Sequence, residues 1–320
     1  MTAAISVPQI HEEPTASVMR ILQLRSRGHN IFEADSLPQF RETVYGGQVL
    51  GQSLMAAYAT IDSQRLVHSL HAYFIRAGNA GKPLEFEVER VRDGRSFSTR
   101  RVQAIQNDRP IFQMMLSFQE AQKGLEHMDT PPEVPPPEDV PDALEIFRHL
   151  DNPVAKFLGK TVAFRARHIN GNLYLGDPEV ADNTQLLWLQ SRHQLPKGTP
   201  QQVHQAFLAY VSDQFMLEPV LRAHKISWRN AQLAIATLDH AMWFHRPVDV
   251  NDWMLFVQRS PSACGGRGMA HTSIYSREGQ LIATVAQEGM VRLRIPDGTK
   301  SWSFYSEEQV NKAHVSHAKD

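Results

Sequence analysis

The pattern of apolar and polar positions predicts one apolar helix and a series of strands in the first half of the chain. The run from Gly46 to Tyr58 is apolar, and its early glycines predict a helix that lies close against a flat surface. Residues 18–24 precede it and are interpreted as a strand. Four β-favouring runs follow, separated by turns rich in Gly, Asn and Asp: 68–76, 84–92, 96–105 and 111–118. The first half is therefore predicted to be a helix followed by an antiparallel meander.

The composition changes sharply after residue 120. Six prolines, mixed with acidic residues, lie between positions 131 and 141. Such a segment forms neither the interior of a helix nor a central strand, so it predicts a stiff surface linker between two domains. The expected division is a flexible tail over 1–17, a first domain over 18–120, the linker over 121–155, a second domain over 156–295 and an extension over 296–320.

The second half repeats the order of the first. A strand-like run over 207–211 precedes a helix-like run over 213–224, in which Pro219 predicts a late start or a kink. β-favouring runs follow over 232–245, 253–258, 269–276 and 281–286. One offset of 168 residues relates three pairs of positions: Tyr45 and Asp213, Ser69 and Thr237, Gln119 and Gln287. The pattern predicts a diverged duplication, with the complete polar set in the second half alone.

The composition excludes several classes of protein. Hydrophobic residues make up 42% and charged residues 21% of the chain, as in ordinary globular proteins. The net charge of −1 does not suggest a nucleic-acid partner, and no apolar run approaches the ~20 residues that span a bilayer. The single cysteine, Cys264, excludes an internal disulfide and is expected to be a small buried hydrophobe. Since the first residues lack a secretory signal pattern, a cytoplasmic protein is expected.

The common catalytic and ligand-binding motifs are absent. The chain contains no G-x-S-x-G, G-x-G-x-x-G, P-loop, H-E-x-x-H or paired C-x-x-C motif. His240 and His245 are five positions apart, which places them on opposite faces of a strand. No metal site is therefore predicted, and the chemistry must come from other polar side chains.

Seven blocks of residues, taken together and in this order, resemble the type II acyl-CoA thioesterases of bacteria and their peroxisomal relatives. These blocks cover 45–52, 68–78, 93–98, 109–112, 210–213, 238–247 and 287–289. The resemblance runs from Val18 to Arg292 and implies an α+β double hot-dog fold. In that fold each half is a long helix wrapped by a curved antiparallel sheet.

The resemblance also implies an activity. It predicts hydrolysis of fatty acyl-CoA to the free acid and CoA, without a cofactor, by a homo-oligomer of double hot-dog chains. The sequence ends in Ala318-Lys319-Asp320 rather than in a Ser-Lys-Leu type address. This ending favours the cytoplasm and a bacterial type of enzyme, whereas the preferred acyl chain length stays open.

The family's catalytic residues correspond to Asp213, Thr237 and Gln287, each of which has the expected residue type. Asp213 is expected at the start of a helix, where N–H groups and the macrodipole favour a carboxylate. It would accept a proton from water. Thr237 and Gln287 each offer a donor and an acceptor, so they can fix the remaining hydrogen bonds of that water. No covalent acyl intermediate is then needed.

The substrate-binding residues are predicted from position and residue type. Backbone N–H groups around Gly46 and Gly47 of the other half are expected to face the oxyanion. The candidates for the CoA phosphates are arginines near turns: Arg76, Arg95, Arg246 and Arg267. The candidates for an apolar acyl slot beside a helix are Met216, Leu217, Met242 and Trp243.

Two alternatives stay open. A hot-dog hydratase or dehydratase would use an acid–histidine pair, and Asp239 with His240 or His245 offers one. A non-catalytic acyl-CoA binding module would have the same fold but would not need Asp213, Thr237 and Gln287 together. Release of free CoA thiol from a saturated acyl-CoA separates hydrolysis from both alternatives.

Overall fold

The computed structural model describes residues 12–39, 42–61, 64–150, 153–230 and 232–293. The helices of these residues are α1 (Pro14–Ile21), α2 (Gly46–Tyr58), α3 (Ala143–Arg148), α4 (Pro153–Thr161), α5 (Gln201–Ser212) and α6 (Glu218–Ala223). The strands of the first half are β1 (Arg25–Gly28), β2 (Ile31–Ala34), β3 (Leu66–Phe74), β4 (Leu84–Asp93), β5 (Phe97–Gln106) and β6 (Arg109–Gln119). Those of the second half are β7 (Phe164–His168), β8 (Thr184–Ser191), β9 (Leu233–Thr237), β10 (Asp239–Phe244), β11 (Met254–Cys264), β12 (Arg267–Ser276) and β13 (Leu281–Leu293).

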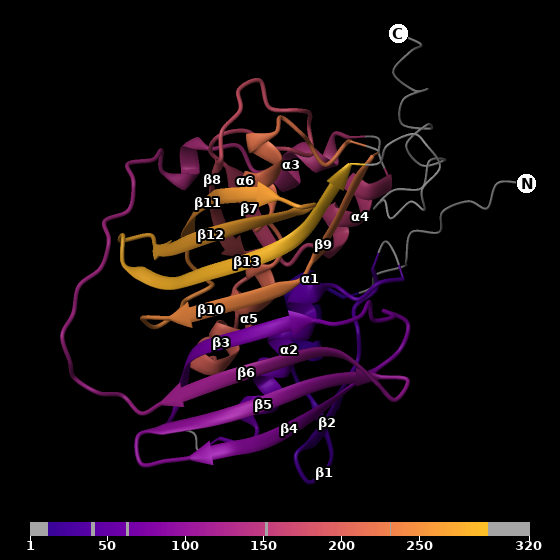
Figure 1. Ribbon diagram of the computed structural model, residues 1–320. Coiled ribbons are helices and arrows are strands. Elements are labelled where there is room, and N and C mark those ends of the chain that lie inside the picture. Colours follow the sequence, from indigo (N-terminus) through magenta and orange to yellow (C-terminus); the bar gives the residue numbers. More distant parts are fainter. Residues whose placement is uncertain (1–11, 40–41, 62–63, 151–152, 231, 294–320) are drawn as a thin grey trace, which may run out of the picture.

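One antiparallel sheet runs through both halves of the described chain. Its strand order is β1-β2-β4-β5-β6-β3-β10-β13-β12-β11-β8-β7, and β9 pairs with β13 off this path. The halves join where β3 pairs with β10, with His71 opposite Ala241. On the two sides of this junction the order β4-β5-β6-β3 matches β11-β12-β13-β10, and α2 and α5 lie against one face of the sheet (Figure 1). The expected α+β double hot-dog fold is therefore confirmed.

The two long helices, α2 and α5, pack against each other in antiparallel directions. A Cβ atom on Gly47 would lie 2.0 Å from the carbonyl oxygen of Tyr210, and one on Gly51 would lie 3.1 Å from that of Ala206. The Tyr45 hydroxyl donates a hydrogen bond to the same Tyr210 oxygen at 2.7 Å. The early glycines therefore let α2 approach the backbone of the other helix, as only residues without a side chain can.

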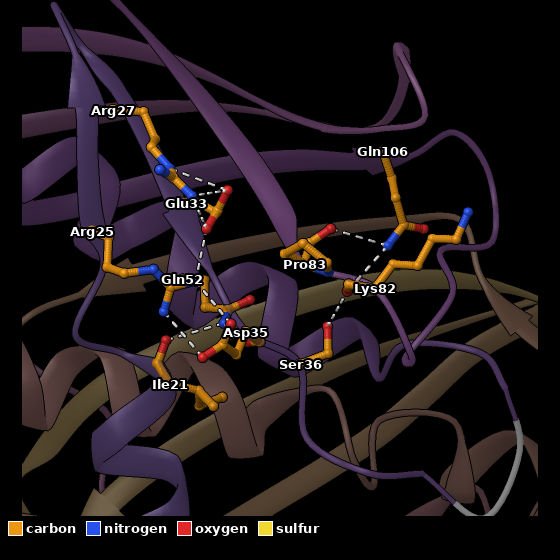
Figure 2. Close-up of polar contacts among 10 residues, drawn as sticks. All are labelled: Ile21, Arg25, Arg27, Glu33, Asp35, Ser36, Gln52, Lys82, Pro83 and Gln106. Carbon is orange, nitrogen blue, oxygen red and sulfur yellow. Dashed lines mark hydrogen bonds and ion pairs between the residues drawn. The ribbon is translucent and has the colours of Figure 1, made fainter.

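Buried glutamines of α2 attach the N-terminal segment to the body. Gln52 Nε2 donates to the carbonyl oxygen of Ile21 at 3.0 Å and to that of Asp35 at 2.8 Å (Figure 2). Gln48 Oε1 accepts from the backbone N–H of Leu37 at 2.9 Å. Since these side chains bind the segments on both sides of the β1–β2 hairpin, they hold that hairpin over the helix.

The proline-rich segment covers the outer face of the second half. Figure 1 shows it running from the end of β6 around the edge of the molecule to α3. Val134 and Val140 pack with Trp188, and the indole N–H of Trp188 donates to the carbonyl oxygen of Pro135 at 3.0 Å. The expected linker, residues 121–155, also contains α3 and the start of α4, two helices that were not predicted. We propose that the boundary between the two halves lies in this segment.

The N-terminal element is a helix and not the expected strand. α1 begins at Pro14, within the stretch expected to be a loose tail, and Glu13 caps it by accepting from two backbone N–H groups. Val18 and Ile21 are buried in the core, at the spacing of one face of a helix. Proline in the first turn and a capping acid before it favour a helix start.

The element before Asp213 was also predicted wrongly. Residues 207–211, interpreted as a strand, lie inside α5, and all of them are buried between the sheet and α2. A helix that is apolar all round has the same run of apolar residues as a buried strand, so periodicity does not separate the two. Asp213 therefore follows the end of α5, whereas Tyr45 precedes α2, and the offset of 168 does not relate equivalent positions.

Two further predictions concern the burial of Cys264 and the helix that contains Pro219. Cys264 ends β11 and is exposed, so the expectation of a buried hydrophobe was wrong. Pro219 lies in the first turn of α6, in agreement with the expected late start of that helix. Proline is tolerated there because the first N–H groups of a helix have no intrahelical partner.

The burial of the acid Glu218 is expected to make the stability of the protein depend on pH. It is fully buried at the start of α6, and its Oε1 accepts from the indole N–H of Trp228 at 2.8 Å. Burial raises the pKa of Glu218 from 4.5 to about 7. The folded protein keeps this proton up to about pH 7, whereas the unfolded chain releases it near pH 4.5. The free energy of unfolding therefore falls as the pH rises through this window.

We expect Glu218→Gln to remove this contribution because an amide does not ionise. The stability of the variant relative to the natural protein should grow by about 3 kcal/mol between pH 4.5 and 7, and then stay constant. Urea unfolding of both proteins at several pH values measures the difference. Burial lowers the pKa of His168 to about 3. Because His168 is present in both proteins, its own contribution to the pH dependence of stability largely cancels in the comparison. If the free energies of unfolding of the two proteins differed by a constant amount at all pH values, the expectation would be wrong.

Candidate active site

A cavity of about 570 Å³ lies between the two halves and contains the predicted catalytic residues. The first half contributes Tyr45, Gly46 and Phe74 to its lining. The second half contributes Asp213, Thr237 and Gln287, which come from three separate segments of the chain. Its volume is within the usual range for small-molecule sites, roughly 300–1,000 Å³.

The three predicted catalytic side chains form one hydrogen-bonded chain. Thr237 Oγ1 donates to Asp213 Oδ1 at 2.9 Å, and Gln287 Nε2 donates to Thr237 Oγ1 at 3.1 Å. The strand pairing explains why Thr237 and Gln287 meet. Thr237 ends β9 opposite Gly289 of β13, and Gln287 is two residues away on the same face of that strand.

The electrostatic support of Asp213 comes from the other half. Asp213 caps the C-terminus of α5, the end of a helix that disfavours an anion. Its carboxylate faces the first residue of α2, because a Cβ atom on Gly46 would lie 2.7 Å from Asp213 Oδ2. The first N–H groups of α2 have no partner within that helix, and its macrodipole favours negative charge. Asp213 was expected to begin a helix of its own half, which was wrong; the helix start that favours its charge is that of α2.

The series of polar side chains continues to His240, which was predicted only as a member of the acid–histidine pair of the hydratase alternative. His240 Nδ1 lies 2.6 Å from Gln287 Oε1, and Ser212 Oγ lies 3.2 Å from His240 Nε2. Burial lowers the pKa of His240. Its position follows from strand alternation, since His240, Met242 and Phe244 all point inward from β10. This alternation is the signal in the sequence that could have placed His240 in the interior beside the site.

The acid–histidine pair of the hydratase alternative does not form a hydrogen bond. Asp239 Oδ1 accepts from the backbone N–H of Glu288 at 2.8 Å. His240 bonds to Gln287 and Ser212 instead. His245 is exposed and bonds to Thr284 Oγ1 at 2.9 Å. The structure therefore gives each of these three residues a different set of partners.

The structure brings only some of the predicted substrate-binding residues to the cavity. Gly46, Arg76 and Leu217 line it, and Arg76 Nη1 also donates to the carbonyl oxygen of Pro110 at 2.6 Å. The others do not line the cavity: Gly47 packs on Tyr210, Arg95 is exposed, Arg246 donates to the carbonyl oxygen of Leu281, Arg267 pairs with Glu288, Met216 and Met242 are buried in the core, and Trp243 contacts His71.

Part of the apolar lining comes from segments that the sequence analysis left unassigned. Val154, Phe157 and Leu158 of α4 line the cavity, together with Tyr174 and Trp228. The α4 residues follow the proline-rich segment, and the two aromatic residues lie in irregular connections. Because the residues meet only in three dimensions, no local pattern signals their shared role.

Over the residues that the structure describes, no group of three or more His, Cys, Asp or Glu side chains is arranged to hold a metal ion. No helix within these ranges is long and apolar enough to cross a membrane.

Comparison with protein families gives two matches in the order of the two halves. A model described as "Acyl-CoA thioesterase N-terminal domain" matches residues 34–119. A model described as "Acyl-CoA thioesterase" matches residues 157–290. The second match includes all three predicted catalytic residues, whereas α3 and the start of α4 lie between the two matches.

Individual relatives match over most of the chain. Acyl-CoA thioesterase 2 of Haemophilus influenzae is 35% identical over 86% of this chain and 97% of its own length. Human acyl-coenzyme A thioesterase 8 is 33% identical over 87% of this chain and 89% of its own length. The crystal structure of acyl-CoA thioesterase II TesB2 from Mycobacterium marinum is 38% identical, with a TM-score of 0.72, over 87% of this chain and 98% of that chain.

A more distant solved structure supports the fold alone. A protein from Alicyclobacillus acidocaldarius, described as having a hot dog fold, is 20% identical with a TM-score of 0.72 over 87% of this chain. The two family matches and the extent of the closer relatives lead to one assignment: the chain belongs to the acyl-CoA thioesterase family and is a thioester hydrolase.

Proposed function

We propose that the chain hydrolyses fatty acyl-CoA to the free acid and CoA by direct attack of a water molecule bound at Asp213. The observation that carries the proposal is the hydrogen-bonded chain from Gln287 through Thr237 to Asp213 at the wall of an apolar cavity. A thioester carbonyl is electrophilic and a thiolate leaves readily, so the reaction needs positioning, a base and oxyanion stabilisation.

In this proposal each group has one task. Asp213 Oδ1 is occupied by the Thr237 hydroxyl, which leaves Oδ2, on the side of Gly46, to accept a proton from water. One N–H of the Gln287 amide donates to Thr237, and its second N–H can bind the water oxygen. Thr237 thus holds the acid and the amide at a fixed separation, and the water lies between them.

The reaction then proceeds in two balanced steps. The water oxygen forms a bond to the carbonyl carbon, its proton passes to Asp213, and the carbonyl oxygen becomes an oxyanion beside the N–H groups at the start of α2. The tetrahedral intermediate breaks its carbon–sulfur bond, CoA leaves as thiolate, and the proton on Asp213 neutralises the thiolate. Neither step forms a bond between the acyl group and the protein.

The acyl chain is proposed to occupy the apolar part of the cavity beside α4. Phe157 is only 4% exposed and lines this part of the cavity. We expect Phe157→Ala to change the ratio of kcat/KM for long over medium acyl chains about 10-fold in favour of the longer chains, because a few methylene groups in an apolar pocket have an effect of this size. Assays with C8, C12 and C16 acyl-CoA measure the ratio.

A matched variant separates this effect from a general loss of packing. Phe97→Ala makes the same truncation at an exposed position on β5, outside the residues that line the cavity. Its ratio should equal that of the natural protein. A chain-length ratio that is unchanged in Phe157→Ala would contradict the placement of the acyl chain.

Release of thiol from palmitoyl-CoA tests the proposed activity. The expected result is stoichiometric formation of CoA and palmitic acid, without added metal or cofactor. Conversion of an enoyl-CoA to hydroxyacyl-CoA without thiol release would favour a hydratase. Binding of acyl-CoA without turnover would favour a non-catalytic module.

We also propose that the chain acts as a homo-oligomer in the cytoplasm. The support is the exposed Tyr73 on the outer face of β3 and the free Cys264.

A further inference from the structure

We propose that His240 is a positioning residue for the hydrolysis: it holds the Gln287 side-chain amide in the single orientation that directs the Thr237 proton to Asp213. The inference rests on the proposed function and extends it to a residue outside the cavity lining. His240 is 1% exposed and sits on β10, between β3 and β13 in the centre of the sheet.

The register of the sheet places His240 against Gln287. The β10–β13 ladder ends at the pair Ala241 and Ala286, and His240 and Gln287 are the next residues along the two strands. Directly opposed side chains on one face of a sheet lie within contact distance. The contact is polar here, because His240 Nδ1 and Gln287 Oε1 are 2.6 Å apart.

The direction of every hydrogen bond among these side chains follows from the carboxylate of Asp213, at which the series ends. A carboxylate only accepts hydrogen bonds, so the Thr237 hydroxyl proton must point to Asp213 Oδ1. Thr237 has then used its one proton and must accept from Gln287, which places Nε2 toward Thr237. The Gln287 oxygen consequently faces His240, and Nδ1 must carry the histidine proton.

The other side of the imidazole connects back to the residue next to Asp213. With its proton on Nδ1, neutral His240 presents Nε2 as an acceptor, 3.2 Å from Ser212 Oγ. The Ser212 hydroxyl also lies 2.9 Å from the carbonyl oxygen of Ala209, so its single proton serves one of the two acceptors at a time. Ser212, the last residue of α5, and Asp213 are adjacent in the chain. The network is therefore a ring that closes through the backbone.

An amide without this donor would have two orientations of similar energy. Rotating the Gln287 amide by half a turn would place its oxygen toward Thr237, and the hydroxyl would then donate to Gln287 instead of Asp213. The second amide N–H, which we assign to the attacking water, would be lost at the same time. Because the site is buried, an unsatisfied Gln287 oxygen would also be costly, which makes the histidine donor effective.

The test compares two substitutions that differ in the donor they retain. The Asn side chain places its amide nitrogen near the position of Nδ1, whereas Leu removes both ring nitrogens. We expect His240→Leu to lower kcat for palmitoyl-CoA about 100-fold, the size of effect that follows from misplacing a catalytic group by about 1 Å, with little change in KM. His240→Asn should recover at least about 10-fold of that loss. His245→Leu, the same change at the exposed histidine of this segment, should leave kcat unaltered.

A double-mutant cycle shows whether His240 acts through Gln287. In a Gln287→Ala background there is no amide to orient, so adding His240→Leu should lower kcat by no more than about 2-fold. Equal losses from His240→Leu in both backgrounds would overturn the proposal in favour of a structural role. So would a normal kcat in His240→Leu while Gln287→Ala is slow. A normal kcat in Gln287→Ala would instead contradict the proposed function.

Folding is monitored for each variant by thermal unfolding. If His240→Leu does not fold, the comparison moves to His240→Asn and His240→Gln, which place an amide near Nδ1 and near Nε2, respectively. The proposal expects the Asn variant to be at least about 10-fold faster than the Gln variant. Equal rates for the two would overturn it.

Discussion

Replacing Asp213 with asparagine is expected to lower kcat for palmitoyl-CoA by about 1,000-fold while the protein stays folded. The amide has nearly the shape of the carboxylate, so the contacts with Thr237 and with the start of α2 keep their geometry. It does not accept a proton from water at neutral pH, so the attacking water loses its base. Thiol release at saturating substrate measures the loss.

A neighbouring acid supplies the control for this variant. Asp239 begins β10 and accepts from a backbone N–H, without lining the cavity. Asp239→Asn should keep kcat within about 2-fold of the natural protein, because the Asn side-chain oxygen can still accept from the backbone N–H of Glu288 and the residue does not line the cavity. If Asp213→Asn turned over at more than a tenth of the natural rate, Asp213 would not be the base.

The largest expected effect on stability is that of Gly47→Ala. The added Cβ atom would lie 2.0 Å from the carbonyl oxygen of Tyr210 and 2.6 Å from the Tyr45 ring. Relief requires α2 and α5 to move apart, because the first of these contacts is with backbone. We expect a loss of about 3 kcal/mol or more, at the upper end of the cost of overpacking a core. Urea unfolding at constant pH measures it.

The control for Gly47→Ala is the same change where space is available. Gly159 lies in α4, and a Cβ atom there would meet nothing within 4 Å. Since alanine has a higher helix propensity than glycine, Gly159→Ala should match or exceed the stability of the natural protein by up to about 1 kcal/mol. Equal unfolding midpoints for the Gly47 and Gly159 variants would show that α2 and α5 are not tightly apposed.

Elements whose structure is decided locally were predicted most accurately from the sequence. The helix over Gly46–Tyr58 has the predicted bounds, and β3 to β6 lie within a few residues of the predicted runs because alternation and turn residues define them. Prediction failed where tertiary burial decides: residues 206–211 of α5 are all apolar, so this stretch has no helical period to detect. The strand expected at 18–24 failed for a different reason, because the cap at Glu13 was overlooked.

For the candidate site, too, some features could be predicted from the sequence and others depend on tertiary contacts. Asp213, Thr237 and Gln287 were named from the family resemblance, and the structure brings them into one hydrogen-bonded chain. The reason given for Asp213 was wrong, since the supporting helix start belongs to α2 and lies far away in the sequence. His240 required the β10–β13 register, which a single sequence does not reveal.

Rapid-quench analysis of a single turnover tests the central claim most directly, because direct attack by water predicts that no acyl group is ever attached to the protein. With enzyme in excess over palmitoyl-CoA, CoA and palmitic acid should form at the same rate from the first time point. Intact-protein mass spectrometry of the quenched samples should show only the unmodified chain. A burst of CoA ahead of the acid, accompanied by a protein species heavier by one palmitoyl group, would contradict the account.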